Sequence, residues 1–227
     1  MNQEEQFIVN YMTGLSNLEA ALAGQVGESE RQEKLLFAAR CFERALDSGY
    51  SFPPDEKESE VDCRVKLAML LVQFNYQDNS TISKSGLSTE LARAVKELEE
   101  ALKLDAAARG LLLMDRRLAA EILLCLDSLW LAQSSYRYKR FGASGALGYL
   151  QDKPKLFEHI GDVNLPGLCA MLFQYWTEVG SPATGEQWLR RAAKGETFDD
   201  VASGTRFCIQ STHYKGMAQR MLSQREV

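Results

Sequence analysis

Apolar residues recur at intervals of three and four along most of this 227-residue chain, the spacing of helices that bury one face. The first such segment spans 3–23, and Gly24 follows it. Ser29, with Gln32 three residues later, predicts a capping box for a second helix that stops at Gly49. Period-two alternation does not persist, so the sequence predicts an all-α fold. The apolar side of the first helix carries Phe7, Ile8, Tyr11, Leu15, Leu18 and Leu22.

Breaks and caps place the later helices. Pro53 and Pro54 interrupt the chain, and Asp55 offers an N-cap to a third helix that reaches Tyr76. The polar segment 77–88 is predicted to be a long loop. The remaining helices are predicted over 91–102, 107–138, 165–178, 182–194 and 199–223.

The segment 107–138 is the most apolar of these and leaves little polar face over its middle, which predicts a central helix buried on several sides. The least regular part of the chain follows at 141–163, where glycines and a proline interrupt any long helix. The glycine-rich stretch 142–148 is predicted to be a flexible loop. A phosphate-binding loop would follow a strand and often end in lysine.

One spacing recurs in three helices: a small residue, a large apolar residue four positions later, and an alanine three after that. In the segment before the third copy, Leu172 and Phe173 should face Gly185, and Gly180 marks the turn. The pattern resembles the second helix of a tetratricopeptide repeat, where the small residue lets two helices approach closely. The three copies are Ala38, Phe42 and Ala45; Ala94, Leu98 and Ala101; and Gly185, Leu189 and Ala192.

The resemblance implies one helical-repeat domain over 1–227, with stacked antiparallel helix pairs in a right-handed superhelix or a compact helical array. Helix pairs and the central helix would occupy 1–138, an irregular connection 139–163, and a helix pair with a final helix 164–227. The three copies are unevenly spaced, which departs from the family's regular period. Such stacks carry a groove lined by the first helix of each pair, which binds peptides or partner helices.

Composition narrows the class of protein. The net charge is −5 and the pI about 5.3, which argues against a nucleic-acid partner because such a partner requires a positive face. The N-terminus does not read as a signal peptide, and no stretch is long and apolar enough to span a bilayer. Together with cysteines that form no CxxC pair, this predicts a cytoplasmic protein with free thiols. The cysteines are Cys41, Cys63, Cys125, Cys169 and Cys208.

No catalytic motif is present. His159 and His213 have no second histidine or cysteine three or four residues away, so no zinc site is expected. The sequences GxSxG, HExxH and the Walker motif do not occur. We therefore expect no catalytic residues, no metal, no cofactor and no enzymatic activity. A helical enzyme with a site scattered over distant residues stays an alternative, because such a site leaves no local motif.

The run 136–141 alternates aromatic and basic residues. The favoured interpretation is that the bases lie at a helix C-terminus while the aromatics pack beneath them. In the alternative, Tyr136, Arg137, Tyr138 and Arg140 stack on bases and contact phosphates, as in a nucleic-acid or nucleotide-binding regulator. If the run is functional, an acidic peptide suits it better than a nucleic acid.

The leading hypothesis is a protein–protein interaction scaffold or adaptor that binds a peptide or partner helix, with a homodimer covering an open end as a further possibility. The third helix and the helix 165–178 would line its groove. Phe7, Tyr11, Tyr76 and Trp188 could belong to the core or to the groove. The polar candidates on the lining helices are Arg64, Gln73, Asn75, Gln174 and Thr177.

Overall fold

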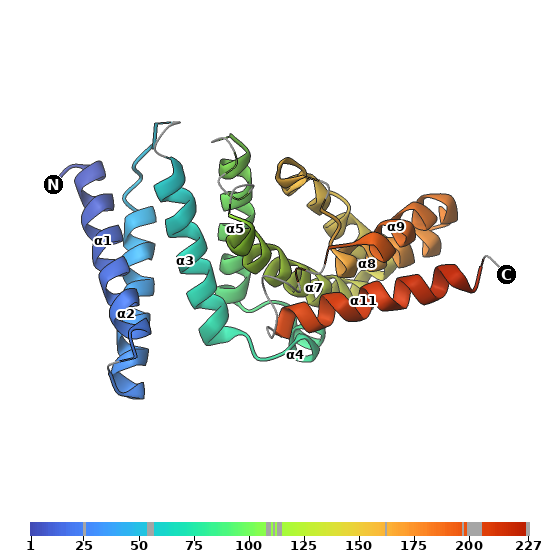
Figure 1. Cartoon of the computed structure of the whole chain (residues 1–227), viewed down its shortest axis with the longest axis horizontal. Coiled ribbons are helices and arrows are strands. Elements are labelled where there is room, and N and C mark those ends of the chain that lie inside the picture. The colour runs from blue at the N-terminus through green and yellow to red at the C-terminus, as the bar shows by residue number, and fades with distance from the viewer. Residues whose placement is uncertain are drawn as a thin grey trace. The chain divides into compact units, whose positions relative to one another are not determined.

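The computed structural model describes residues 1–24, 26–53, 57–107, 110, 112, 115–161, 163–196, 198 and 206–225 (Figure 1). All regular secondary structure in these residues is helical, which confirms the all-α prediction. The chain forms two compact units. Unit 1 comprises Met1–Tyr76 and Thr89–Arg109, and unit 2 comprises Gln77–Ser88 and Gly110–Val227.

Unit 1 is a row of four helices in which each packs against the next. They are α1 (Gln3–Leu22), α2 (Glu28–Leu46), α3 (Lys57–Asn75) and α5 (Thr89–Ala107). Helix α3 lies between α2 and α5 and contacts both (Figure 1). It therefore buries apolar side chains on two sides.

The N-terminal ends of α1 and α2 differ in how they are capped. A capping box begins α1, because Asn2 accepts the Glu5 N–H at 2.8 Å and Glu5 accepts the Asn2 N–H at 3.0 Å. The predicted capping box at Ser29 is wrong. Helix α2 begins at Glu28, with Gly27 at the N-cap and no side-chain cap. The predicted cap at Asp55 lies outside the described residues.

Unit 2 is built around a long helix, α7 (Arg116–Leu150), which contacts α4, α8 and α11. Its residues 122–132 are buried without interruption, which confirms that the middle of this helix is enclosed on several sides. The other elements are α4 (Asn79–Ser85), the 3-10 turns η1 (Lys153–Leu156) and η2 (Glu158–Ile160), α8 (Pro166–Glu178), α9 (Pro182–Lys194) and α11 (Arg206–Ser223).

Three sequence predictions in unit 2 need correction. The segment 77–88 is not simply a loop, because Asp78 caps the short helix α4 by accepting the Thr81 N–H at 2.8 Å. The helix predicted over 107–138 begins instead at Arg116, where Asp115 supplies the cap. The expected start of the last helix at 199 lies outside the described residues.

The third correction concerns the glycine-rich stretch 142–148, which is not a loop, because a second helical segment of α7 follows the break at Gly142. Gly142 alone leaves the helical region, with φ 66° and ψ −169°, and introduces a kink. Ala146, Leu147 and Leu150 are buried beyond it. Burial of this apolar face offsets the low helix propensity of the glycines.

The residues of the recurring spacing share one property. All nine are buried, and each large residue is 0% exposed, so the motif marks the faces where helices meet. The pairs α1–α2, α3–α5 and α8–α9 are packed along their lengths.

The α8–α9 pair confirms the close approach expected at Gly185. A Cβ at this position would lie 2.5 Å from the Thr177 hydroxyl and 2.9 Å from the Phe173 carbonyl oxygen. The carbonyl belongs to the α8 backbone, so it cannot move aside as a side chain can. The expected neighbour Phe173 is therefore confirmed, and Thr177 is a contact that the sequence did not predict.

We predict that Gly185→Leu lowers the free energy of unfolding by about 1–3 kcal/mol through overpacking, and that Gly185→Ala lowers it as well. The matched control is Gly148→Ala. Gly148 also lies inside a helix, but it is exposed and nothing lies within 4 Å of an added Cβ. That change should stabilise the protein by about 0.5–1 kcal/mol. Thermal melts that place both Gly185 variants at or above wild type would contradict the close packing.

Candidate functional site

An aromatic cluster joins α1 to the connection between α2 and α3. Phe7 contacts Phe52 edge to face, with ring centroids 4.5 Å apart, and Phe52 contacts Tyr50 in the same way at 4.6 Å. Tyr11 stacks on Phe7 at 5.5 Å. Phe7 is buried, and the other three rings are half-buried. The cluster therefore forms a rigid wall that is open to solvent on one side.

A hollow of about 390 Å³ lies against this cluster, between α1 and the start of α3. We call it the α1/α3 groove. Ile8 and Met12 of α1 rim it and are 48% and 57% exposed. These two side chains give the groove a partly exposed apolar rim. The lining residues are Glu4, Phe7, Ile8, Tyr11, Met12, Tyr50, Phe52, Glu58 and Ser59.

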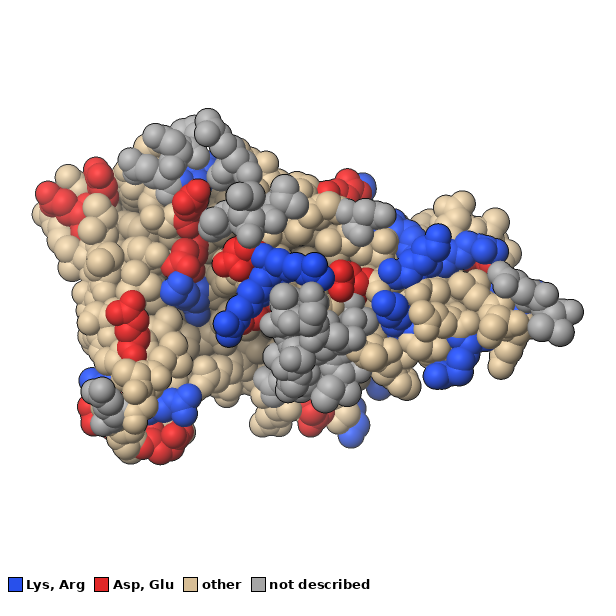
Figure 2. Space-filling model, in the orientation of Figure 1, with Lys and Arg blue, Asp and Glu red and all other residues tan. Residues whose placement is uncertain are grey.

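The charge around the α1/α3 groove has one sign. Glu4 and Glu58 are its charged lining residues, and no Lys or Arg is among the described residues that line it. Both carboxylates are exposed, and neither has an ion-pair or hydrogen-bond partner within the described part of the chain. In Figure 2 the surface over α1 and α3 is largely uncharged, with acidic residues near the start of α1 and both acidic and basic residues along α3.

One hydrogen bond ties the two helices at the groove. The Tyr11 hydroxyl donates to Asp62 at 2.6 Å, and Asp62 also accepts from Lys66. Burial and the bond to Asp62 raise the pKa of Tyr11, so its hydroxyl stays a donor at neutral pH. The groove is therefore held by α1 and α3 together.

A second hollow, of about 370 Å³, lies on another side of the same cluster and shares Phe7, Tyr50 and Phe52 with the groove. Its lining differs in charge, since Lys57 and Arg64 reach it. The Arg64 guanidinium already forms ion pairs with Glu60 and Glu97.

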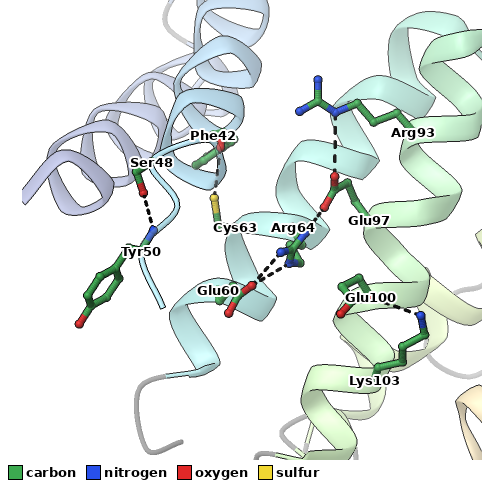
Figure 3. A network of polar contacts seen from close by, with 10 residues as sticks. All are labelled: Phe42, Ser48, Tyr50, Glu60, Cys63, Arg64, Arg93, Glu97, Glu100 and Lys103. Carbon is green, nitrogen blue, oxygen red and sulfur yellow. Dashed lines mark hydrogen bonds and ion pairs between the residues drawn. The ribbon is translucent and has the colours of Figure 1, made fainter. Parts of the chain in front are cut away.

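Arg64, a predicted partner-binding residue, belongs to an ion network (Figure 3). It donates to Glu60 at 2.8 Å and to Glu97 of α5. Arg93 of α5 lies 3.9 Å from Glu97 and also pairs with Glu43 of α2. The Glu97 side chain is only 9% exposed, so its charge depends on these two arginines. The network therefore joins α2, α3 and α5.

Of the other residues predicted to bind a partner, three make hydrogen bonds within their own helix. Gln73 is exposed at the end of α3, and Asn75 donates to the Leu71 carbonyl at 2.8 Å. On α8, exposed Gln174 donates to Glu178 at 2.9 Å. Thr177 donates to the Phe173 carbonyl at 2.8 Å, beneath Gly185. Helix α3 belongs to unit 1 and α8 to unit 2.

The side chains of the run 136–141 make contacts within unit 2. Arg140 donates to the Tyr136 hydroxyl, and Lys139 donates to the Ser83 carbonyl at 3.1 Å. Tyr138 stacks on Tyr175 with centroids 5.4 Å apart. Arg137 lies over the Tyr149 ring at 4.8 Å. The run ends directly before Gly142, where the backbone leaves the helical region, so the bases lie at the C-terminal end of the first segment of α7, as the favoured interpretation expects.

Asp127 is a described carboxylate whose pKa is strongly raised. It is buried in α7 and accepts the Leu168 N–H at 2.7 Å at the start of α8. A Cβ on Gly167 would lie 2.6 Å from the carboxylate, so the glycine permits this approach. Burial raises its pKa to about 7, although N–H donors from Leu168 and Gly167 oppose the shift. Asp127 thus joins α7 to α8.

The sequence analysis identified only part of the α1/α3 groove. Phe7 and Tyr11 were left open between core and groove, and the structure places both at its wall. Ile8, predicted on the buried side of α1, is exposed. Met12, Tyr50 and Phe52 were missed. The signal that could have found the last two was a pair of aromatics beside Pro53 at a helix break.

Three further findings concern the described residues. Cys41, Cys63, Cys125 and Cys169 are buried and form no disulfide with one another, while the Cys208 side chain lies outside the description. No group of three or more His, Cys, Asp or Glu in this part of the chain is arranged to hold a metal ion. None of the helices described is both long enough and apolar enough to cross a membrane.

Comparisons with known proteins gave no match. No protein-family model matches the sequence, and neither the curated proteins nor the solved structures contain a match to the chain.

We predict that Arg64→Met lowers the free energy of unfolding by about 2–4 kcal/mol, because it leaves the buried Glu97 without its closest cation. Adding Glu97→Leu should restore most of the loss. The control Lys103→Met breaks an exposed pair with Glu100 and should cost about 1 kcal/mol or less. Urea denaturation measures all three. A loss for Arg64→Met no larger than that of the control would show that Arg64 is not a structural residue.

We predict a pH dependence of stability that comes from Asp127. Its folded-state pKa of about 7 lies above the unfolded value near 3.9, so the folded protein retains a proton that the unfolded chain has released. This contribution to stability is present below pH 4 and is lost as pH rises to 7. Asp127→Asn cannot ionise, so the variant should gain roughly 3–5 kcal/mol relative to wild type between pH 4 and 7.

Urea titrations at a series of pH values measure this difference. The control Asp152→Asn removes an exposed carboxylate and should follow wild type. A constant difference between Asp127→Asn and wild type across the range would show that Asp127 is ionised throughout in the folded protein.

Proposed function

We propose that the protein is a protein-interaction module that binds a peptide or partner helix in the α1/α3 groove. The observation that carries the proposal is the exposure of Ile8 and Met12 beside a wall of packed aromatic rings. A side chain of the partner that fills this groove would bury its own apolar surface together with theirs. Full burial of one large apolar side chain contributes about 1.5–3 kcal/mol, so two or three anchors suffice for specific binding.

The position of the groove supports a tetratricopeptide-like arrangement for unit 1. In that family the first helix of each pair lines the binding groove, and α1 and α3 are the first helices of the pairs α1–α2 and α3–α5. The proposal covers a binding scaffold and no catalytic activity. It places the protein in the cytoplasm, which the absence of a disulfide among its described buried cysteines supports.

The rigidity of the site also favours binding. The aromatic cluster and the Tyr11–Asp62 hydrogen bond hold the walls in place before any partner arrives. A preformed site loses little conformational entropy on binding. An amphipathic helix presenting apolar residues at every third and fourth position is the segment that suits a groove between two helices.

The test is selection of displayed random peptides on the whole immobilised protein. Enriched peptides should bind wild type and lose at least tenfold in affinity for the double variant Ile8→Ser/Met12→Ser. The matched control is Leu36→Ser/Phe37→Ser, which removes two apolar side chains, each 45% exposed, outside the groove. That variant should bind as wild type does. No enrichment, or equal loss in both double variants, would contradict the proposed site.

A further inference from the structure

The charged residues that line the α1/α3 groove are both acidic, which bears on the charge of its partner. Glu4 lies on one wall and Glu58 on the other, so the apolar floor lies between two carboxylates. Neither carboxylate has a cation partner within the described part of the chain. Elsewhere in the unit Glu43, Glu60 and Glu97 all pair with arginines.

Neither Lys57 nor Lys66 of α3 is among the residues that line the groove. Lys66 pairs with Asp62, and Lys57 lines the second hollow. Glu5, next to Glu4, accepts the N-terminal cap hydrogen bond and adds a further negative charge. The groove therefore presents apolar surface beside two carboxylates, with no Lys or Arg among its described lining residues, and this favours cationic over anionic segments.

We propose that the partner of the α1/α3 groove is a basic amphipathic segment, whose apolar side chains enter the groove while flanking Lys or Arg side chains pair with Glu4 and Glu58. This inference rests on the proposed function and adds the charge of the partner to it. The long stems of Lys and Arg can lie along the rims of the groove while their charged ends reach the carboxylates.

Other occupants fit the same surface less well. A second copy placed by a twofold axis would bring the same acidic groove against itself, so the carboxylates of Glu4 and Glu58 would face those of the other copy, and like charges in an interface are unfavourable. A nucleic acid would bring phosphates against two carboxylates. Both would also leave the rim charges without a counterion from the partner.

The test uses two displayed peptide libraries with the same apolar pattern at positions i, i+3, i+4 and i+7. One library carries Lys or Ser at the remaining positions, and the other carries Glu or Ser. Binders to the whole protein should come from the lysine library. A selected peptide should lose affinity by about 3- to 10-fold on Glu4→Gln/Glu58→Gln, and its affinity should depend less on salt.

The matched control is Glu33→Gln/Glu90→Gln, which removes two exposed carboxylates of unit 1 outside the groove and should leave affinity unchanged. The reversal Glu4→Lys/Glu58→Lys should shift preference toward the glutamate library. Circular dichroism and thermal melts check that each variant is folded.

The outcomes separate the inference from the proposed function. Binders from the glutamate library, or equal affinity of Glu4→Gln/Glu58→Gln and its control, overturn the inference. The proposed function stands in that case if Ile8→Ser/Met12→Ser abolishes binding. No binder from either library overturns both. A monomer–dimer equilibrium that Ile8→Ser/Met12→Ser abolishes would assign the groove to a second copy and also overturn the inference.

Discussion

The close approach of α1 and α2 at Gly14 is the constraint on which the candidate site depends. A Cβ at Gly14 would lie 2.7 Å from the ring of Phe42, which is itself fully buried. Only a residue without a side chain permits this contact without displacing the ring. The contact fixes how α1 lies on α2, and with it the positions of Phe7 and Tyr11 on the same helix.

The second wall of the groove depends on α3, which is held on both sides. Cys63 contacts the Phe42 carbonyl at 3.6 Å on the α2 side, and Arg64 binds Glu97 on the α5 side (Figure 3). Neighbouring residues of one helix thus face opposite partners. Burying charged groups costs free energy, and the ion pairs of the network offset that cost. The network therefore fixes the relative positions of the helices more than it adds to the net stability. Arg64 therefore helps to position α3, and its charge is paired with Glu60 and Glu97 within unit 1.

Much of the helical framework could be predicted from the sequence, because period and caps are local. The Pro182 start and Gly195 end of α9 and the buried middle of α7 are examples. The second helical segment of α7, beyond the break at Gly142, could not be predicted, because burial of Leu150 by other elements outweighs local propensity. Asp78 was assigned to a polar loop, although its side chain caps the short helix α4.

The candidate site was less predictable, because exposure depends on neighbours that a sequence does not reveal. Ile8 has the spacing of a core residue, yet no helix of unit 1 covers it in the structure. Arg64 has the character of a surface residue, but α5 brings Glu97 to it from 33 positions along the chain. Tyr50 and Phe52 lie in an irregular connection, where no periodicity indicates which side is buried.

Methyl NMR on the whole chain tests the central claim most directly. The signals of Ile8 and Met12, assigned through Ile8→Val and Met12→Leu, would be followed as a peptide from the lysine library is added. The account predicts that both shift and saturate together, while Ile122 and Met171 of unit 2 keep their positions. Saturable shifts at Ile122 or Met171, with Ile8 and Met12 unchanged, would contradict it.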